Sequence, residues 1–193
     1  PREEPPGLSA CNDRGMARVP YVDPATASPA TAKALSRLPD LNVFKLLAHA
    51  ETALVPWLRY SGALLNDLAL DPLLRELAIL QVGRLAARYE WDQHAPVARA
   101  CGATEEQLAA LERGDLSPFP PRERAVLEFA ADLVRDGEVP DDRYAALAEQ
   151  LGDREIVELC LVTGAYLGLA RVMSALRIDP DEPSALGAIK MST

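Results

Sequence analysis

Glu90 and His94 are the residues of this sequence whose types and spacing best suit proton transfer. His94 is one of two histidines, and Glu90 lies four residues before it, a spacing at which two side chains meet on one face of a helix. A carboxyl group buried beside a histidine can have its pKa moved toward neutrality, which suits general acid–base catalysis. Tyr89 and Trp91 flank Glu90 and could wall the pair off from water. The same spacing also fits a purely structural hydrogen bond between His94 and Glu90.

Pro96 constrains the helix that would carry this pair. Proline is tolerated in the first turn of a helix, whereas further along it removes a hydrogen bond and bends or breaks the helix. We therefore expect a helix that begins near Asp92 or bends there. In the first case Glu90 and His94 lie at the start of a helix, where free N–H groups and the dipole favour a substrate carboxylate or a developing oxyanion.

Other polar residues could join this pair or serve the fold. Arg75 and Glu76 lie in the preceding apolar segment and would face the same cavity if two helices fold back on each other. Such charged pairs are more often exposed to solvent. His49, with Glu51 nearby, lies in a segment expected to flank the core, and we interpret it as structural.

The cysteines argue against disulfide and zinc chemistry. Cys11, Cys101 and Cys160 are far apart in the sequence and form no CxxC or Cys/His pattern. Cys101 precedes a helix-ending glycine and Cys160 lies in an apolar segment, so both are expected to be small buried residues and not reactive thiols. No metal site is predicted.

Composition indicates one globular domain. With 193 residues, of which 49% are hydrophobic and 25% charged, the chain is long enough for a single core. A net charge of -9 without a basic stripe argues against nucleic-acid binding. No stretch approaches about 18 uninterrupted apolar residues, and the N-terminus lacks the layout of a signal peptide. We expect a cytoplasmic protein that contacts no membrane.

Helix signals recur along the chain, and no stretch alternates apolar and polar residues over the length of a strand. Start signals, namely a capping residue, in some cases followed by proline, occur at Ser28, Asp71, Thr104 and Asp153. Stop signals occur at Gly102, Gly114, Gly137 and Gly152. The first helix should end near Leu38, and the segment from Asn42 to Leu68 should form two helices separated at Pro56 or one helix kinked there. The predicted fold class is all-α, with the helix after Pro72 central to the core.

The last predicted helix, which begins after Gly152, is apolar almost all round. Small residues such as Gly164 and Gly168 are interleaved with its larger apolar residues. A helix without a polar face must be buried, and small residues allow close approach of a neighbour. This helix therefore either threads the core or packs against a second subunit, and we expect a homo-oligomer.

The two ends of the chain are expected to lie outside the folded domain. Residues 1–15 are rich in proline, charge and small polar residues and show no apolar period, so we predict a disordered extension. Met16 resembles a natural start. The predicted division is an extension of residues 1–15, a helical domain of residues 16–180 and a tail of residues 181–193.

Three runs of sequence resemble the carboxymuconolactone decarboxylase family: Arg75–Leu80 (RELAIL), Tyr89–His94 (YEWDQH) and Cys101–Thr104 (CGAT). The segments Arg18–Asp23 and Phe44–His49 are also similar to the N-terminal part of the longer members. This resemblance covers roughly residues 16–179. It implies the all-helical alkylhydroperoxidase-D-like fold, with protomers assembled through helix packing into dimers, trimers or hexamers.

The resemblance distinguishes two branches of the family. The peroxidase branch uses a CxxC pair followed by a histidine, in which one thiolate attacks peroxide and the other resolves the sulfenic acid. Here the matching stretch is Ala87–Glu90, so both cysteine positions are lost. Thiol peroxidase activity is therefore not expected.

The decarboxylase branch acts on a carboxylated lactone without a metal or organic cofactor. Loss of carbon dioxide leaves an electron pair delocalised toward a carbonyl, so donors must face the developing enolate and an acid must protonate carbon. By resemblance, His94 would be the donor or acid, Glu90 its partner, and Glu76 would orient the site. Arg75 or Arg84 would hold the substrate carboxylate, and Tyr89 and Trp91 would contact the substrate.

Our leading hypothesis from the sequence is a cofactor-independent lyase. It would act on a small carboxylated lactone or a related oxygenated carboxylic acid by proton transfer between glutamate and histidine. One alternative is a natural-product tailoring enzyme of the same fold, such as an isomerase, dehydratase or cyclase. Another is a helical oligomer that binds a small ligand in the same cavity without catalysis.

Overall fold

The computed structural model describes residues 17–181, which are all-helical, with no strand among them. This agrees with the predicted fold class. The helices are α1 (Pro29–Leu35), α2 (Asn42–Leu47), α3 (Glu51–Asn66), α4 (Pro72–Ala86), α5 (Arg88–Ala100), α6 (Glu105–Arg113), α7 (Pro121–Arg135), α8 (Asp141–Ala148) and α9 (Asp153–Leu176).

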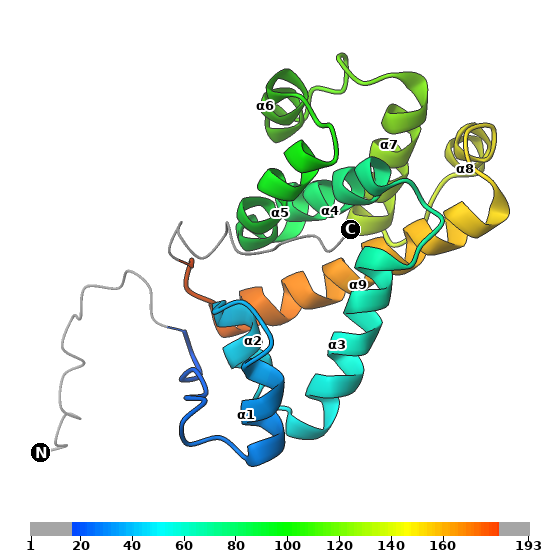
Figure 1. Cartoon of the computed structure of the whole chain (residues 1–193). Coiled ribbons are helices and arrows are strands. Elements are labelled where there is room, and N and C mark those ends of the chain that lie inside the picture. The colour runs from blue at the N-terminus through cyan, green and yellow to red at the C-terminus, as the bar shows by residue number, and fades with distance from the viewer. Residues whose placement is uncertain (1–16, 182–193) are drawn as a thin grey trace, which may run out of the picture.

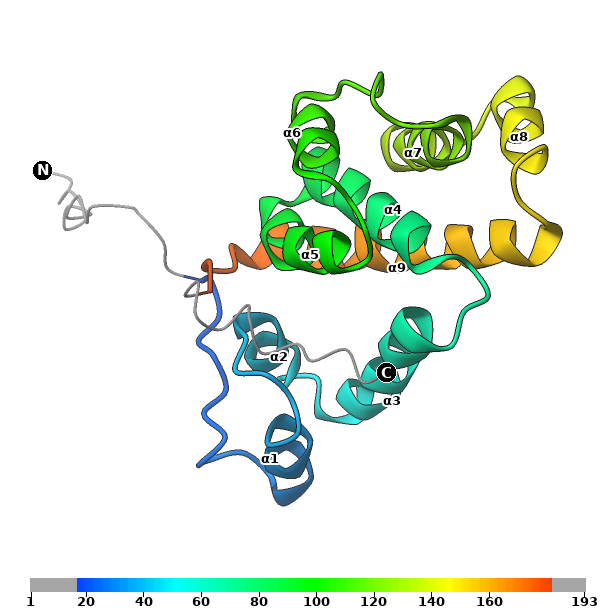
Figure 2. The ribbon, with the colours of Figure 1, turned by 45° about the horizontal axis from the view of Figure 1, so that its top comes forward.

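The helices form two groups on opposite sides of α9. Figures 1 and 2 show α1–α3 on one side of this helix and α4–α8 on the other. Within the second group, α4 packs against α5, α7 and α9, and its residues from Leu74 to Gly83 are all buried. The prediction that this helix is central to the core is confirmed.

A tight turn folds α5 back against α4. One extended residue, Ala87, joins the two helices, and a Cβ atom on Gly83 would lie 2.6 Å from the backbone nitrogen of Trp91. The absence of a side chain at Gly83 therefore permits the close approach of the two backbones. This approach brings Glu76, on α4, beside His94, on α5.

Most of the predicted start and stop signals lie at helix ends. Ser28, Asp71 and Thr104 each accept a hydrogen bond from a backbone N–H in the first turn of the helix that follows. Gly114 and Gly137 have φ values of 79° and 74°, a left-handed conformation that glycine adopts without strain. Local chemistry thus determines these boundaries.

Three predicted boundaries were wrong. The first helix, α1, ends at Leu35 and not near Leu38. The break in the second segment falls at residues 48–50, and Pro56 lies inside α3. A proline there removes only one intrahelical hydrogen bond, and the packing of α3 against α1 and α9 offsets that loss. Asp153 is the first residue of α9, and Gly152 occupies the capping position.

One side of α9 is buried and the other is an exposed apolar stripe. Ile156, Leu159 and other inward residues belong to the core. On the outer side, Val157, Leu161 and Val172 are 58%, 45% and 42% exposed. We call these three residues the α9 stripe. The helix therefore threads the core and also offers an apolar surface.

By length and composition alone, α9 could also cross a membrane. Core helices of globular proteins pass the same test, and the inner side of α9 packs against α4 and α7. Its apolar character is therefore accounted for by the core and the stripe.

The segment that follows α9 holds the N-terminal part of the fold in place. The Asp179 N–H donates to the Tyr21 hydroxyl at 2.9 Å, and a carboxylate oxygen of Asp181 accepts from the Asn42 N–H at 2.8 Å. Asp181 thereby caps α2, because Leu41, at the capping position, has no side chain that can do so. Asp181, predicted to begin the tail, thus belongs to the fold; the predicted extension of residues 1–15 and the tail beyond Asp181 lie outside the described residues.

Candidate active site

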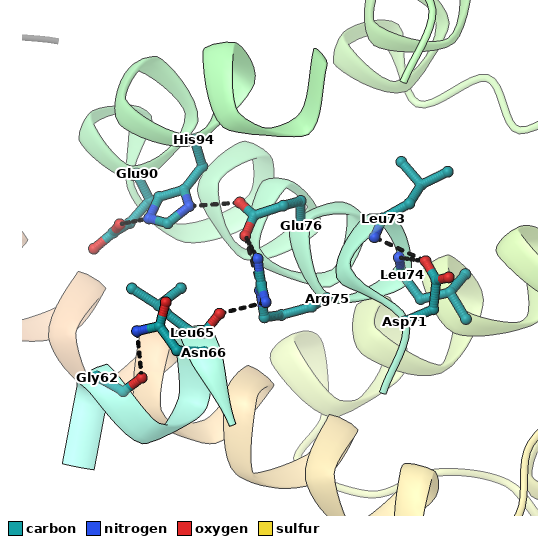
Figure 3. A network of polar contacts seen from close by, with 10 residues as sticks. All are labelled: Gly62, Leu65, Asn66, Asp71, Leu73, Leu74, Arg75, Glu76, Glu90 and His94. Carbon is teal, nitrogen blue, oxygen red and sulfur yellow. Dashed lines mark hydrogen bonds and ion pairs between the residues drawn. The ribbon is translucent and has the colours of Figure 1, made fainter. Parts of the chain in front are cut away.

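The side chain of His94 lies between two buried glutamates, as Figure 3 shows. Its Nδ1 atom is 2.8 Å from Oε2 of Glu76, and its Nε2 atom is 3.8 Å from Oε2 of Glu90. Glu76 is fully buried and Glu90 is 3% exposed. Carboxyl groups at such depth are costly unless they are paired or protonated, so each must be accounted for.

Glu76 is held on its far side by Arg75. The Nε and Nη2 atoms of Arg75 each lie 2.9 Å from Oε1 of Glu76, and Nη1 donates to the Leu65 carbonyl at 2.5 Å. Leu65 belongs to the last turn of α3, where carbonyl groups lack helical partners and attract a cation. Arg75 therefore links α3 to the site and neutralises Glu76. The predicted role of Arg75 in holding a substrate is not supported by this position.

The two glutamates differ in protonation. Burial raises the pKa of Glu76, but His94 and Arg75 together outweigh burial and lower it. Glu90 has no such arginine, and burial raises its pKa to about 7 despite the nearby His94. Glu76 is thus a fixed anion, while Glu90 can gain or lose a proton near neutral pH.

His94 is stabilised in its protonated form. Burial lowers the pKa of its imidazole, but the carboxylates of Glu76 and Glu90 outweigh this effect, and the net pKa is raised. The Nδ1–H bond to Glu76 orients the ring, so Nε2 faces Glu90. This is the arrangement by which a carboxylate positions a catalytic histidine in other enzymes.

A cavity of about 540 Å³ adjoins the pair, within the usual range for small-molecule sites. Helices α2, α3, α5 and α9 contribute most of its lining. Its residues are mostly apolar: Leu38, Leu41, Val43, Phe44, Trp57, Leu58, Ser61, Gly62, Leu64, Leu65, Asn66, Tyr89, Glu90, Gln93, His94, Val97, Ala165, Tyr166 and Leu169.

Tyr166 and Gln93 are polar residues of this cavity that were not predicted from the sequence. The ring of Tyr166, on α9, meets the His94 ring edge to face, with centroids 4.9 Å apart. Gln93, 6% exposed, has a side-chain oxygen with no hydrogen-bond partner among the described residues. A tyrosine within the otherwise apolar helix α9 was the available signal, because a buried phenol usually serves a polar contact.

The structure separates Tyr89 from Trp91. Tyr89 lines the cavity together with Glu90 and His94, as expected from the sequence. Trp91 lies on the opposite face of α5, in the core between α4, α6 and α7. Residues two apart on a helix point in different directions, so only one of these two aromatic side chains can face the cavity. The prediction that Trp91 walls the site was wrong.

Arg84 also lies away from the cavity. Its Nε atom donates to the Gln81 side chain at 2.9 Å, and its guanidinium group lies close to Gly114. It lines a separate depression with Trp91, on the other face of the α4–α5 pair. The predicted role of Arg84 in holding a substrate carboxylate is therefore not supported.

The helix that carries Glu90 and His94 begins earlier than expected. It starts at Arg88, four residues before Asp92, and continues through Pro96. Glu90 lies in its first turn, but its side chain points to His94 and binds no backbone N–H among the described residues. The expectation of an anion site at a helix start near Asp92 was wrong, because packing of α5 against α4 maintains the helix on both sides of the proline.

His49 lies outside the cavity, with its Nε2 atom 2.6 Å from the Pro20 carbonyl oxygen. This contact ties the segment before α1 to the end of α2. The position agrees with the structural role predicted for His49.

The comparisons with known proteins fit this geometry. Residues 53–132, which include Arg75, Glu76, Glu90 and His94, match the family model described as the carboxymuconolactone decarboxylase family. This central part of the chain is similar to the carboxymuconolactone decarboxylase family. No curated protein matches the sequence.

Solved structures share the fold of this chain. An alkylhydroperoxidase AhpD core, an uncharacterized peroxidase-related protein from Ralstonia eutropha JMP134, is 21% identical with a TM-score of 0.78, covering 90% of this chain and 97% of its own. An uncharacterized peroxidase-related protein from Silicibacter sp. TM1040 is 21% identical with a TM-score of 0.70. The match covers 90% of this chain and 96% of that protein. A protein of unknown function from Agrobacterium tumefaciens is 19% identical with a TM-score of 0.64. The match covers 70% of this chain and 95% of that protein. These likenesses establish the fold.

The described cysteines lie outside the lining of the cavity. The stretch Ala87–Glu90 carries no thiol, and neither Cys101 nor Cys160 lines the cavity. Burial raises the pKa of both thiols, which makes them weak nucleophiles. Cys11 lies outside the described residues. Within residues 17–181, no group of three or more His, Cys, Asp or Glu side chains is arranged to hold a metal ion.

Proposed function

We propose that this chain is an enzyme that transfers protons on a small molecule bound in the cavity beside His94. The observation that supports this most directly is the placement of one histidine between two buried glutamates of opposite pKa shift. In enzymes, two neighbouring titratable groups whose pKa values are shifted apart often act as the general acid and the general base.

Glu76 has the role of a fixed anion. It accepts the Nδ1–H of His94 and is itself neutralised by Arg75. A histidine held in this way keeps one orientation, and its raised pKa favours the protonated form, so its Nε2–H can be donated to an oxygen of the substrate. Glu76 and Arg75 are positioning residues in this scheme.

Glu90 has the role of the base. With a pKa of about 7, it is partly ionised at neutral pH and can exchange a proton at little cost. A carbon next to a carbonyl would lose its proton to Glu90, while the carbonyl oxygen would gain a proton from His94. The products of this step are a neutral enol, a neutral imidazole and a protonated Glu90. Return of the Glu90 proton to a different carbon, together with return of the enol O–H proton to His94, completes an isomerisation and restores both residues.

A carboxy-lyase that acts on a carboxylated lactone is the narrower form of this proposal. The family match and the same pair of residues support it, since an enolate formed by loss of carbon dioxide would need the same donor and acid. The binding-protein alternative makes a different prediction, namely that Glu90→Gln changes ligand affinity and no turnover occurs.

The test is hydrogen–deuterium exchange at the carbon atoms beside the carbonyl of 2-tetralone, followed by NMR in deuterated buffer. We expect the wild type to catalyse exchange and His94→Ala to lose about 100-fold or more of the rate, the usual contribution of a general acid or base. His49→Ala, which changes a histidine outside the cavity, is the matched control and should retain the wild-type rate. Equal exchange by the wild type and His94→Ala would contradict the proposal.

A further inference from the structure

The cavity offers no unpaired positive charge that could bind an anionic substrate. Within residues 17–181, no lysine or arginine lines it. The nearest cations are those of the site itself, and both are already paired: Arg75 with Glu76, and His94 with Glu76 and Glu90. When all four side chains are charged, the two cations, Arg75 and His94, are balanced by the two anions, Glu76 and Glu90. No cation is then left to pair with a substrate carboxylate.

The polar part of the cavity instead presents hydrogen-bond acceptors. Oε1 of Glu90 and Oε1 of Gln93 are both buried, and neither has a hydrogen-bond partner within the described part of the chain. Both residues line the cavity and lie one helical turn apart on α5. A buried acceptor without a partner is costly, so a ligand that supplies O–H or N–H groups here recovers that cost.

Most of the remaining surface of the cavity is hydrocarbon. Side chains such as Phe44 of α2, Trp57 of α3 and Leu169 of α9 surround the polar end formed by α5. Burial of apolar ligand surface against such walls is favourable, whereas burial of an unpaired carboxylate is strongly unfavourable.

We propose that the cavity binds an uncharged, largely hydrocarbon molecule that carries an O–H or N–H group, and that the substrate belongs to this class. This inference rests on the proposed function only where it calls the ligand a substrate. It argues against the carboxy-lyase form of the proposed function, because a carboxylated substrate requires an unpaired cation that the lining of the cavity does not contain.

Calorimetric titration with a matched pair of probes tests the proposal. 2-Naphthalenemethanol carries a hydroxyl group, and 2-naphthoate has the same rings with a carboxylate. At about pH 8, above the pKa of Glu90 near 7, we expect the alcohol to bind at least about tenfold more tightly than the carboxylate. Equal binding, or tighter binding of 2-naphthoate, would overturn the proposal.

Two variants place a lysine inside and outside the cavity. Ser61→Lys introduces an ammonium group on α3 at the cavity lining, and it should increase 2-naphthoate affinity at least about tenfold by pairing with the carboxylate. Ser117→Lys, at an exposed position between α6 and α7, is the matched control and should leave both affinities unchanged. Unchanged 2-naphthoate binding in a folded Ser61→Lys protein would show that the probes bind elsewhere and would overturn the proposal.

Binding and exchange separate this proposal from the proposed function. Selective binding of the alcohol without His94-dependent exchange on 2-tetralone would support the ligand class and remove the acid–base function. Exchange that depends on His94, together with tight binding of 2-naphthoate, would support the function and remove the ligand class.

Discussion

Replacing Glu76 with glutamine should destabilise the fold strongly while leaving the shape of the side chain intact. Arg75, 4% exposed, would keep its charge but lose the carboxylate that neutralises it, and only uncharged acceptors such as the Leu65 carbonyl would remain. Removing one partner of a buried ion pair costs about 3–5 kcal/mol, because it leaves an uncompensated charge. For a protein of this size that loss corresponds to a fall in Tm of about 6–20 °C.

Urea denaturation followed by circular dichroism at neutral pH measures this loss. In the double variant Arg75→Met with Glu76→Gln, both charges are absent, so most of the lost free energy of unfolding should return. Glu123→Gln is a matched control, because Glu123 is half-buried and accepts a single hydrogen bond from Gln107; it should cost no more than about 1 kcal/mol. A Glu76→Gln protein within about 1 kcal/mol of the wild type would refute the reasoning from burial.

Three further predictions concern protonation, helix packing and assembly. Glu90 binds its proton more tightly when folded, with a pKa of about 7 against 4.5. Its contribution to the free energy of unfolding should therefore fall by about 3 kcal/mol as the pH rises from below 4.5 to above about 7. Urea titrations of Glu90→Gln over the same pH range should not show this decrease. Gly83→Ala should lower the free energy of unfolding by about 1–3 kcal/mol, because the new Cβ meets the Trp91 backbone. Gly62→Ala, where the Cβ meets nothing within 4 Å, should raise it by about 0.5–1 kcal/mol; equal effects would contradict the packing argument. We propose that a second copy of the chain covers the α9 stripe; sedimentation should then show an oligomer for the wild type and a monomer for Leu161→Glu, and identical sedimentation would exclude this interface.

The sequence was most informative where the chemistry is local. The spacing of Glu90 and His94 placed both side chains on one face of a helix, and the structure brings them to 3.8 Å. Capping residues and left-handed glycines also marked several helix ends correctly. These features depend on residues within a few positions of one another, so they can be predicted without the fold.

The partners of His94 depended on contacts between distant elements. The 2.8 Å contact with Glu76 exists because α5 folds back on α4 at Gly83, and the approach of Tyr166 depends on how α9 crosses α5. The wrong assignment of Trp91 has a different origin. Helical periodicity alone would have separated Trp91 from the cavity face, had α5 been known to run unbroken through Pro96.

The contacts of the segment after α9 have a consequence for how the chain folds as it is synthesised. Leu41 and Val43, made early, pack against Met173, and Asp181 provides the cap of α2. These partners leave the ribosome more than a hundred residues later. Helices α4 to α7 can pack as they emerge, and α1 can pack against α3, whereas the face of α2 that carries Val43 must wait uncovered for Met173. The side of the cavity formed by α2 is therefore completed last, and a chaperone that recognises exposed apolar segments would find its target in the first fifty residues.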